Sequence, residues 1–357
     1  MLGMRDARAP LRMVHAVAPI RICDNGGWTD TWFAGHGKVF NIAVHPGVDV
    51  DVRVHAIDAR PDRVVLNVQN YGDCYAFAPG ALPGRHPLLE AAIDEIGLPD
   101  DLSVEIDITS DVPAGCATGT SAAVTVALIG ALDALTTGCM TRHEVAYAAH
   151  RIEVERLGIQ SGVQDQLCAA YGGINYIEIS PYPNASVSQL SVPDPVWNEL
   201  EQRLMLLFLG RPHRSSDVHE RVIAGLERNG GTSAHLDELR RAAERARDAV
   251  DAADFVALGK AMIANTDAQA QLHADLVGAE ARTAIDVAAA HGALGWKVNG
   301  AGGEGGSVTL LCGPEEDDKD ALLRALHKAD PRFRKIPIRL SRSGLRVWED
   351  ASGMLRA

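Results

Sequence analysis

The chain has 357 residues, and its 34 lysines and arginines against 47 aspartates and glutamates give a net charge of −13. An acidic chain does not favour nucleic acid or an anionic membrane, so we expect neither as a partner. The length exceeds that of one ordinary domain and predicts two.

The cysteines and the apolar stretches indicate where the protein is found. The six cysteines include no Cys-x-x-Cys pair, so neither a zinc site nor a disulfide framework is predicted. The first ten residues lack the apolar core of a signal peptide, and the most apolar stretch, residues 122–135, contains Asp133 and is too short to span a bilayer. We therefore expect a cytoplasmic protein, with a monomer and a homodimer both open.

The opening of the chain is predicted to be rich in strands. Runs of β-branched residues at 12–22, 39–44, 47–56 and 62–77 alternate with glycine and proline. The loop between the first two runs concentrates Arg21, two glycines, two tryptophans and Asp30. Such a loop often carries function, although a turn beside a partly buried indole is an equal alternative.

The stretch at 111–135 is the strongest local signal. A predicted helix at 87–96 precedes an alternating strand at 104–108, which runs into a glycine-bearing turn and a helix over 122–135. A glycine loop that feeds a helix N-terminus offers free N–H groups to phosphate. Thr120 and Ser121 at the helix start could cap the helix or ligate magnesium on a nucleotide. The loop lacks the lysine of a P-loop.

Two further stretches follow in the first half. A predicted helix over 143–157 ends at Gly158, and Asp165 then follows a Ser161-Gly162 turn at the start of an apolar helical stretch. Its carboxylate could cap that helix or serve as a base. Residues 181–195 contain four prolines and no clear periodicity, and they are the predicted domain boundary.

The second half alternates strands and helices. We predict strands at 204–209, 336–340 and 345–348, and helices over 236–258, 279–290 and 318–328. Arg211, His213 and Arg214 open a helix and would suit an anionic or polyhydroxy ligand, or simply a solvated helix start. The glycine-rich segment at 296–312 fits a tight turn between strands. A strand rather than a helix follows its glycines, which disfavours a dinucleotide site.

Four motifs occur in a fixed order, and together they are more specific than any one of them. They are A-P-I-R with G-G-W-T-D-T, then P-A-G-C-A-T-G-T-S-A-A, then Glu153 with S-G-V-Q-D-Q, and last K-V-N-G-A-G-G-E-G-G-S. The set resembles the GHMP small-molecule kinases over about residues 15–340. Its motif variants look most like the branch that holds L-fucokinase and D-glycero-D-manno-heptose 7-phosphate kinase.

The resemblance implies an α+β, two-domain GHMP kinase fold that binds ATP and a sugar in the cleft between its domains. A ribosomal S5-like N-terminal domain would span residues 1–190, and a ferredoxin-like C-terminal domain would span residues 191–357. Asp165 would be the catalytic base and Arg21 would steady the developing charge. Ser121 and Glu153 would bind Mg²⁺, with Glu155 as a second candidate. The residues implied for the ATP phosphates are Pro113, Ala114, Gly115, Cys116, Ala117, Thr118, Gly119, Thr120 and Ser121, and those for the sugar are Asp30, Gly27, Trp28, Thr29, Gly162 and Gly302.

Three departures from the family pattern have consequences. Ala117 and Thr118 replace the usual glycine and leucine, and a positive φ at Ala117 would cost about 1 kcal/mol. Glu304 is an extra residue between the glycines of the last motif, and we expect it to point away from phosphate. Gly27-Trp28 replaces the Glu-His pair of galactokinases, which argues against galactose.

The expected activity is transfer of the γ-phosphate of Mg-ATP to a hydroxyl, with the anomeric one favoured by the branch. The acceptor would be a sugar or sugar phosphate, such as an L-fucose-like sugar or heptose 7-phosphate. Alternatives are a uronic-acid kinase, a non-catalytic sugar and ATP sensor, an ATP-using decarboxylase and, least favoured, a dinucleotide oxidoreductase. The kinase interpretation requires the turn before residue 120 and the carboxylate of Asp165 to meet in one cavity.

Overall fold

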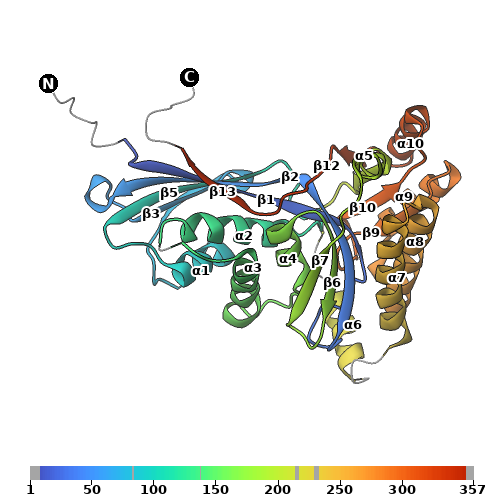
Figure 1. Ribbon diagram of the computed structural model, residues 1–357, viewed down its shortest axis with the longest axis horizontal. Coiled ribbons are helices and arrows are strands. Elements are labelled where there is room, and N and C mark those ends of the chain that lie inside the picture. The colour runs from blue at the N-terminus through green and yellow to red at the C-terminus, as the bar shows by residue number, and fades with distance from the viewer. Residues whose placement is uncertain (1–8, 83, 137, 214–216, 229–232, 351–357) are drawn as a thin grey trace.

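The computed structural model describes residues 9–82, 84–136, 138–213, 217–228 and 233–350, which form two sheets with helices packed against them (Figure 1). The larger sheet has nine strands and the smaller has four. No helix among these residues is both long and apolar enough to cross a membrane.

The larger sheet is built mainly from the first half of the chain. Its main path runs β13-β1-β2-β5-β3-β4, and β3 and β5 are its parallel neighbours. Strands β6 and β7 extend the sheet from the first part of β2. The bounds of the strands from this half are β1 (Arg12–Asn25), β2 (Gly37–Ala56), β3 (Val64–Val68), β4 (Asp73–Phe77), β5 (Leu102–Ser110), β6 (Ile174–Ile179) and β7 (Ala185–Gln189).

The two strands predicted at 39–44 and 47–56 form one strand, β2. The Pro46-Gly47 pair that suggested a break coincides with a register shift in the pairing of β1 with β2, between Ala18 and Ile20. A proline is tolerated there because an irregular position needs no ladder hydrogen bond. Gly47 lets the backbones of β1 and β2 approach closely at this point, since a Cβ on Gly47 would lie 2.2 Å from the carbonyl oxygen of Ala18.

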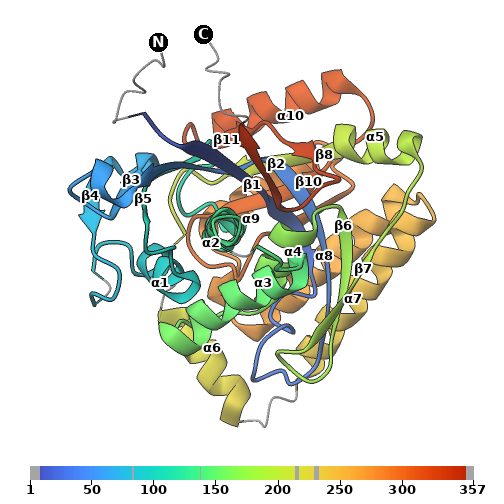
Figure 2. The same ribbon diagram turned by 60° about the vertical axis from the view of Figure 1, so that its left-hand side comes forward.

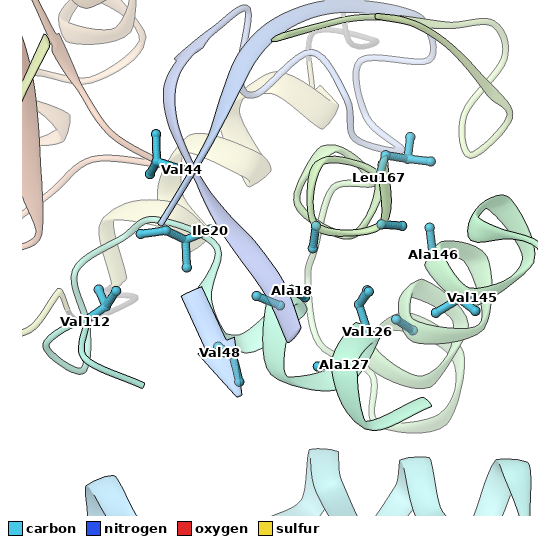
Figure 3. Close-up of a cluster of buried hydrophobic side chains, with 14 of the residues drawn as sticks. Ala18, Ile20, Val44, Val48, Val112, Val126, Ala127, Val145, Ala146 and Leu167 are labelled. Atoms are coloured by element: carbon cyan, nitrogen blue, oxygen red, sulfur yellow. The ribbon is translucent and has the colours of Figure 1, made fainter. Parts of the chain in front are cut away.

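Four helices cover one face of this sheet. They are α1 (Pro87–Ile96), α2 (Thr120–Asp133), α3 (Arg142–Arg151), which continues into a π-helical turn (Ile152–Arg156), and α4 (Gln164–Tyr171). Helix α2 lies between the strands and the other helices, so almost its whole length is buried. Figure 3 shows Val126 and Ala127 of α2 between Ala18 of β1 and Val145 of α3. This packing fixes the start of α2 against the sheet.

The smaller sheet comes from the second half, in the order β11-β8-β10-β9 with antiparallel pairing. Its elements and the helices around it are α5 (Asp194–Arg203), β8 (Leu204–Phe208), α6 (Asp217–Arg228), α7 (Ala234–Asp251), α8 (Phe255–Leu272), α9 (Ala279–Ala290), β9 (Gly295–Val298), β10 (Ser307–Leu311), α10 (Glu316–Ala329) and β11 (Arg334–Ile336). Short 3₁₀ turns lie at Ile57–Ala59, Gln69–Tyr71 and Ala274–Leu276.

The single helix predicted over 236–258 is wrong, because the chain forms α7 and α8 with a sharp connection. Ala253 has φ +54°, which ends α7, and the side chain of Asp254 accepts the N–H of Ala257 to start α8. The two helices lie side by side (Figure 2), and each has a row of buried side chains at helical spacing, so this pattern continues across the break and hides it.

The last strands return to the larger sheet. The strand predicted at 336–340 is wrong as one element, because β11 belongs to the smaller sheet while β12 (Arg339–Leu340) pairs with β2. Strand β13 (Arg346–Asp350) pairs with β1 and closes its open edge (Figure 1). Residues 339–340 and 346–350 therefore lie in the sheet of the first half, although the sequence assigned them to the second domain. The predicted boundary segment also contains β7 of that sheet.

Candidate functional site

The loop between β5 and α2 ends at the bare N-terminus of α2. Gly119 is the N-cap residue with φ +71°, and no side chain of the described residues caps the helix. Thr120 and Ser121 are the first two helical residues, so the interpretation of either as the cap is wrong. The hydroxyl of Thr120 lies 3.3 Å from that of Thr118, and Ser121 is exposed. The first N–H groups of α2 are thus without a side-chain partner, as an anion site requires.

Ala117 in this loop has φ +59°, the left-handed conformation that favours glycine. We expect Ala117→Gly to raise the free energy of unfolding by roughly 0.5–1 kcal/mol, because relief of this strain exceeds the added entropy of glycine. Ala253→Gly, at φ +54° between α7 and α8, is the matched control. Urea unfolding should show similar gains for both, and only Ala117→Gly should change the KM for ATP. Destabilisation by Ala117→Gly alone would mean that its methyl group packs productively.

The second glycine-rich segment packs directly against this loop. The Ser307 hydroxyl donates to the carbonyl of Cys116 at 2.6 Å. A Cβ on Gly300 would lie 3.0 Å from the carbonyl oxygen of Ala117, and one on Gly306 would lie 3.2 Å from the Ala117 Cβ. Two segments that lie far apart in the sequence therefore form one wall. The segment between β9 and β10 is longer than the tight turn that we predicted.

Asp165 and Arg21 meet beside the loop. The Nε and Nη2 atoms of Arg21 donate to the two carboxylate oxygens of Asp165 at 2.8 and 3.2 Å. Arg21 also donates from Nη1 to the carbonyl of Ala117 and from its backbone N–H to that of Thr118, at 3.0 Å for the latter. Burial by itself would lower the pKa of Arg21, but Asp165 and Asp24 raise it above the ordinary value. The guanidinium therefore stays charged.

The Asp165 carboxylate lies next to Gly119, the last residue of the phosphate loop. A Cβ on Gly119 would lie 3.0 Å from Asp165 Oδ2, so glycine makes room for the carboxylate at the start of α2. Val163 rather than Asp165 occupies the N-cap position of α4, so the interpretation of Asp165 as a helix cap is wrong. The turn before residue 120 and the carboxylate of residue 165 adjoin, as the kinase interpretation requires.

A cavity of about 540 Å³ opens next to this pair. It is lined on one side by the loop after β1 and the turn before α4, and on the other by α6 and the loop after β9. Of the residues predicted for substrate or catalysis, the cavity brings together Arg21, Gly27, Trp28, Asp30, Gly162 and Asp165.

Two residues predicted to bind the sugar do not line the cavity. The Thr29 hydroxyl donates to the Gly26 carbonyl at 2.7 Å and accepts the N–H of Lys38 at 3.1 Å, so Thr29 holds its own turn together. A Cβ on Gly302 would lie 2.1 Å from the Leu276 carbonyl oxygen, so this glycine permits a close backbone contact. Adjacency to a motif in the sequence did not distinguish residues that shape a turn from residues that face a ligand.

Asp30 is buried at the wall of this cavity. Its Oδ2 accepts the N–H of Gln164 at 3.1 Å, and a Cβ on Gly162 would lie 2.0 Å from that oxygen. Burial raises the pKa of Asp30 to about 6, and the nearby charge of Asp165 adds to the rise. The neighbouring Trp28 has φ +76° and donates from its indole nitrogen to the Ala301 carbonyl at 3.2 Å, which ties this loop to the second half of the chain.

The raised pKa of Asp30 predicts a pH-dependent effect on stability. A carboxyl with a pKa of about 6 when folded and 3.8 when unfolded stabilises the fold fully below its unfolded pKa and loses that contribution as pH rises through the folded pKa. Between pH 5 and pH 8, Asp30→Asn should therefore gain about 1.4 kcal/mol relative to the wild type. Urea unfolding at both pH values measures this gain. Asp100→Asn, at a fully exposed side chain, is the control, and an equal gain there would contradict the prediction.

Glu153 lies in the interior on the π-helical turn, whereas Glu155 is exposed. The Glu153 carboxylate accepts the side-chain N–H of Gln166 at 2.7 Å, and burial raises its pKa to about 7. The charge of Asp165 adds to this rise in the pKa of Glu153, so Glu153 lies near the catalytic pair. Hydroxyl and carboxylate oxygens are donors that Mg²⁺ accepts, as Ser121 and Glu153 would offer. Among the described residues no three His, Cys, Asp or Glu side chains gather as a metal site, so phosphate and water oxygens would have to complete the coordination.

The sequence analysis missed a buried ion pair that joins the two halves. The ammonium of Lys297 on β9 is fully buried and lies 3.4 Å from a carboxylate oxygen of Asp24 at the end of β1. Asp24 also accepts the N–H of Gly300 at 3.0 and 3.2 Å and lines the cavity. The available signal was Lys297 itself, a lysine within an otherwise apolar strand pattern that begins the last motif.

The basic residues that open α6 do not line the cavity where they are described. Arg211 pairs with Glu280 and lies 3.9 Å from Glu304, whose side chain is 81% exposed. His213 donates its backbone N–H to the Gly115 carbonyl at 2.6 Å, beside the phosphate loop. Arg214 is outside the described residues.

The comparisons with known proteins agree with this arrangement. The model of the GHMP kinases N terminal domain matches residues 87–173, and that of the GHMP kinases C terminal matches residues 246–332. The mevalonate kinase of Thermococcus sibiricus is 31% identical over 257 residues, which cover 68% of this chain and 69% of that protein. The chain belongs to the GHMP kinase family.

Other relatives of this GHMP kinase act on sugars by name. The D-glycero-alpha-D-manno-heptose 7-phosphate kinase of Campylobacter jejuni is 27% identical over 247 residues, covering 69% of this chain and 71% of that protein. The crystal structure of a D-glycero-D-manno-heptose 1-phosphate kinase from Bacteroides thetaiotaomicron shares the fold, with a TM-score of 0.74, 20% identity and coverage of 95% and 100%. The family and the α+β, two-domain GHMP fold expected from the motifs are confirmed.

Proposed function

We propose that this GHMP kinase transfers the γ-phosphate of Mg-ATP to a hydroxyl of a sugar bound in the 540 Å³ cavity. The observation that carries the proposal is the position of Asp165. Its carboxylate touches the N-cap of the phosphate-loop helix, is held by Arg21 at 2.8 Å and faces the cavity. A base at the junction of a phosphate site and a polar cavity is what transfer to a hydroxyl requires.

Each residue then has a role in the reaction. The bare N–H groups at the start of α2 and in the loop before it bind the phosphates of ATP. Asp165 accepts the proton of the attacking hydroxyl, and Arg21 stabilises negative charge that develops between the hydroxyl and the phosphate. Asp30 accepts a hydrogen bond from another hydroxyl and so orients the sugar. Ser121 and Glu153 would hold Mg²⁺, which neutralises phosphate charge when bound.

The anomeric hydroxyl is the proposed acceptor, on the basis of the branch that the motifs resemble. Residues 1–190 would supply the phosphate loop and the base, and residues 191–357 would complete the cavity through α6 and the loop after β9. This division remains a proposal, since α7 and α8 share one apolar core with β1 and β2.

The test is ADP release from Mg-ATP by the purified chain with a panel of sugars, sugar phosphates and uronic acids. At least one sugar should stimulate ADP release above the rate without sugar, and nuclear magnetic resonance of the product should place the phosphate on one hydroxyl. Sugar binding without ADP release from any member would instead support a sensor. Release of carbon dioxide would indicate a decarboxylase.

A further inference from the structure

The charged side chains that line the cavity are mostly acidic. Asp24, Asp30, Asp165 and Glu220 line it, and Arg21 is the one cationic side chain among the described lining residues. Arg21 already donates two N–H groups to Asp165 and a third to the carbonyl of Ala117. Arg21 thus pairs with Asp165, and Lys297 pairs with Asp24, whereas Asp30 and Glu220 have no ion pair among the described residues. An anionic group on the ligand would therefore meet net negative charge from Asp30 and Glu220.

Among the described residues before α6, Arg211 and His213 could carry positive charge, and both make contacts outside the cavity. Arg211 is bonded to Glu280 and lies near Glu304, and neither it nor His213 lines the cavity. The described charged side chain that α6 contributes to the cavity lining is Glu220, while Asp30 and Asp165 of the first half also line it. The acidic character thus comes from both walls.

The remaining wall is aromatic and apolar. Trp28, Trp32 and Phe33 line it together with Ile223 of α6. The ring of Phe33 is 6.2 Å from that of Trp28 and 5.2 Å from that of Trp32. The indole of Trp32 is fixed to α6 by a hydrogen bond of 3.0 Å to Glu227. Fixed aromatic faces pack against the C–H face of a sugar ring, and carboxylates accept hydrogen bonds from its hydroxyls.

We propose that the acceptor is a neutral sugar, and that the cavity discriminates against sugars bearing a phosphate or a carboxylate. This inference rests on the proposed function and makes it specific. Asp30 and Glu220 bind hydroxyls of a neutral ring and repel the anionic counterpart of the same sugar. The chain would therefore differ in substrate from its Campylobacter relative, whose name specifies a heptose 7-phosphate.

Matched pairs of sugars that differ only in charge test the proposal. The first pair is D-glycero-D-manno-heptose and its 7-phosphate, and the second is D-mannose and D-mannose 6-phosphate, with L-fucose as a further neutral sugar. ADP release gives kcat/KM for each, and quenching of tryptophan fluorescence without ATP gives the dissociation constant, since Trp28 and Trp32 line the cavity. Within each pair that reacts, kcat/KM should be about 100-fold or more higher for the neutral sugar. Within each pair that binds, the dissociation constant should be lower for the neutral sugar by the same factor.

Substitution of Glu220 tests the cause of the preference. Glu220→Lys should lower the ratio of kcat/KM for the neutral sugar to kcat/KM for the anionic sugar by at least tenfold. Glu220→Gln should give a ratio between those of the wild type and Glu220→Lys. Glu304→Lys is the control, since that exposed residue does not line the cavity, and it should leave the preference unchanged.

The outcomes separate this inference from the proposed function. Preference for the anionic member, or equal use of both, overturns the inference while ADP release still supports a kinase. Quenching that favours neutral sugars with no ADP release supports the inference and overturns the transfer reaction. Neither quenching nor ADP release with any sugar overturns both.

Discussion

The Asp165→Asn variant is expected to bind ATP normally and to lose about 10³-fold or more in kcat for ADP formation. Asparagine retains an oxygen that can accept one hydrogen bond from Arg21, so the guanidinium keeps a partner. It cannot take up the proton of the attacking hydroxyl. The loss should therefore appear in kcat, because the fold and the phosphate loop are left in place.

Steady-state ADP release and calorimetric ATP titration measure the two quantities separately. Asp194→Asn is the matched control, because Asp194 also pairs with an arginine, Arg342, at 2.5 Å, but on the exposed surface at α5. It should have wild-type kcat, as surface pairs contribute little. An Asp165→Asn enzyme with full activity would refute the assignment of the base. Equal loss of ATP affinity would point to a role in shaping the phosphate loop.

The second large effect is expected at the buried pair of Lys297 and Asp24. Lys297→Met should lower the free energy of unfolding by about 3–5 kcal/mol, because it leaves a fully buried carboxylate without its cation. The backbone N–H of Gly300 remains as a partner of Asp24 and keeps the effect within this range. Chemical unfolding followed by circular dichroism measures the loss. Lys319→Met is the control, at a partly exposed lysine on α10 that has no carboxylate partner among the described residues.

The double variant Lys297→Met with Asp24→Asn separates the pair from the packing around it. Removing both charges should recover more than half of the loss, since an unpaired buried charge costs more than its removal. If Lys297→Met alone is too unstable to purify, the double variant still tests the prediction. A double variant as unstable as the single one would place the effect in packing rather than in charge.

Local elements could be predicted from the sequence because their signals are local. Helices α1 and α9 have the bounds that proline and apolar spacing predicted, and β5 follows its alternating pattern. The connection between α7 and α8 was missed because one left-handed residue, Ala253, ends a helix without interrupting its amphipathic pattern.

The site depended on information that no local pattern holds. The pairing of Arg21 with Asp165 joins residues 144 positions apart. The family resemblance alone assigned both residues to the site, and it did not predict that they form an ion pair. The pair of Asp24 and Lys297, also the product of tertiary packing, had no such guide and was missed. Thr29 and Gly302 are in the right motifs, yet Thr29 bonds the backbone of its own turn and Gly302 packs against Leu276 and Gln269. The second half of the chain supplies α6 and Ala301 to the cavity. Its position therefore decides which residues of the turn after β1 face the ligand.

The return of β13 to β1 has a consequence for the order of folding during synthesis. Leu345, which leads into β13, fills the groove at Gly130 of α2, where a Cβ would come within 2.7 Å of its side chain. Until the ribosome has passed residue 346, β1 therefore shows an unpaired flank and α2 an uncovered notch, which nascent chains expose to misassociation. Strand β1 can complete its pairing only after β13 has left the ribosome, so the larger sheet that holds the phosphate loop and Asp165 forms fully only after residue 350 has been translated.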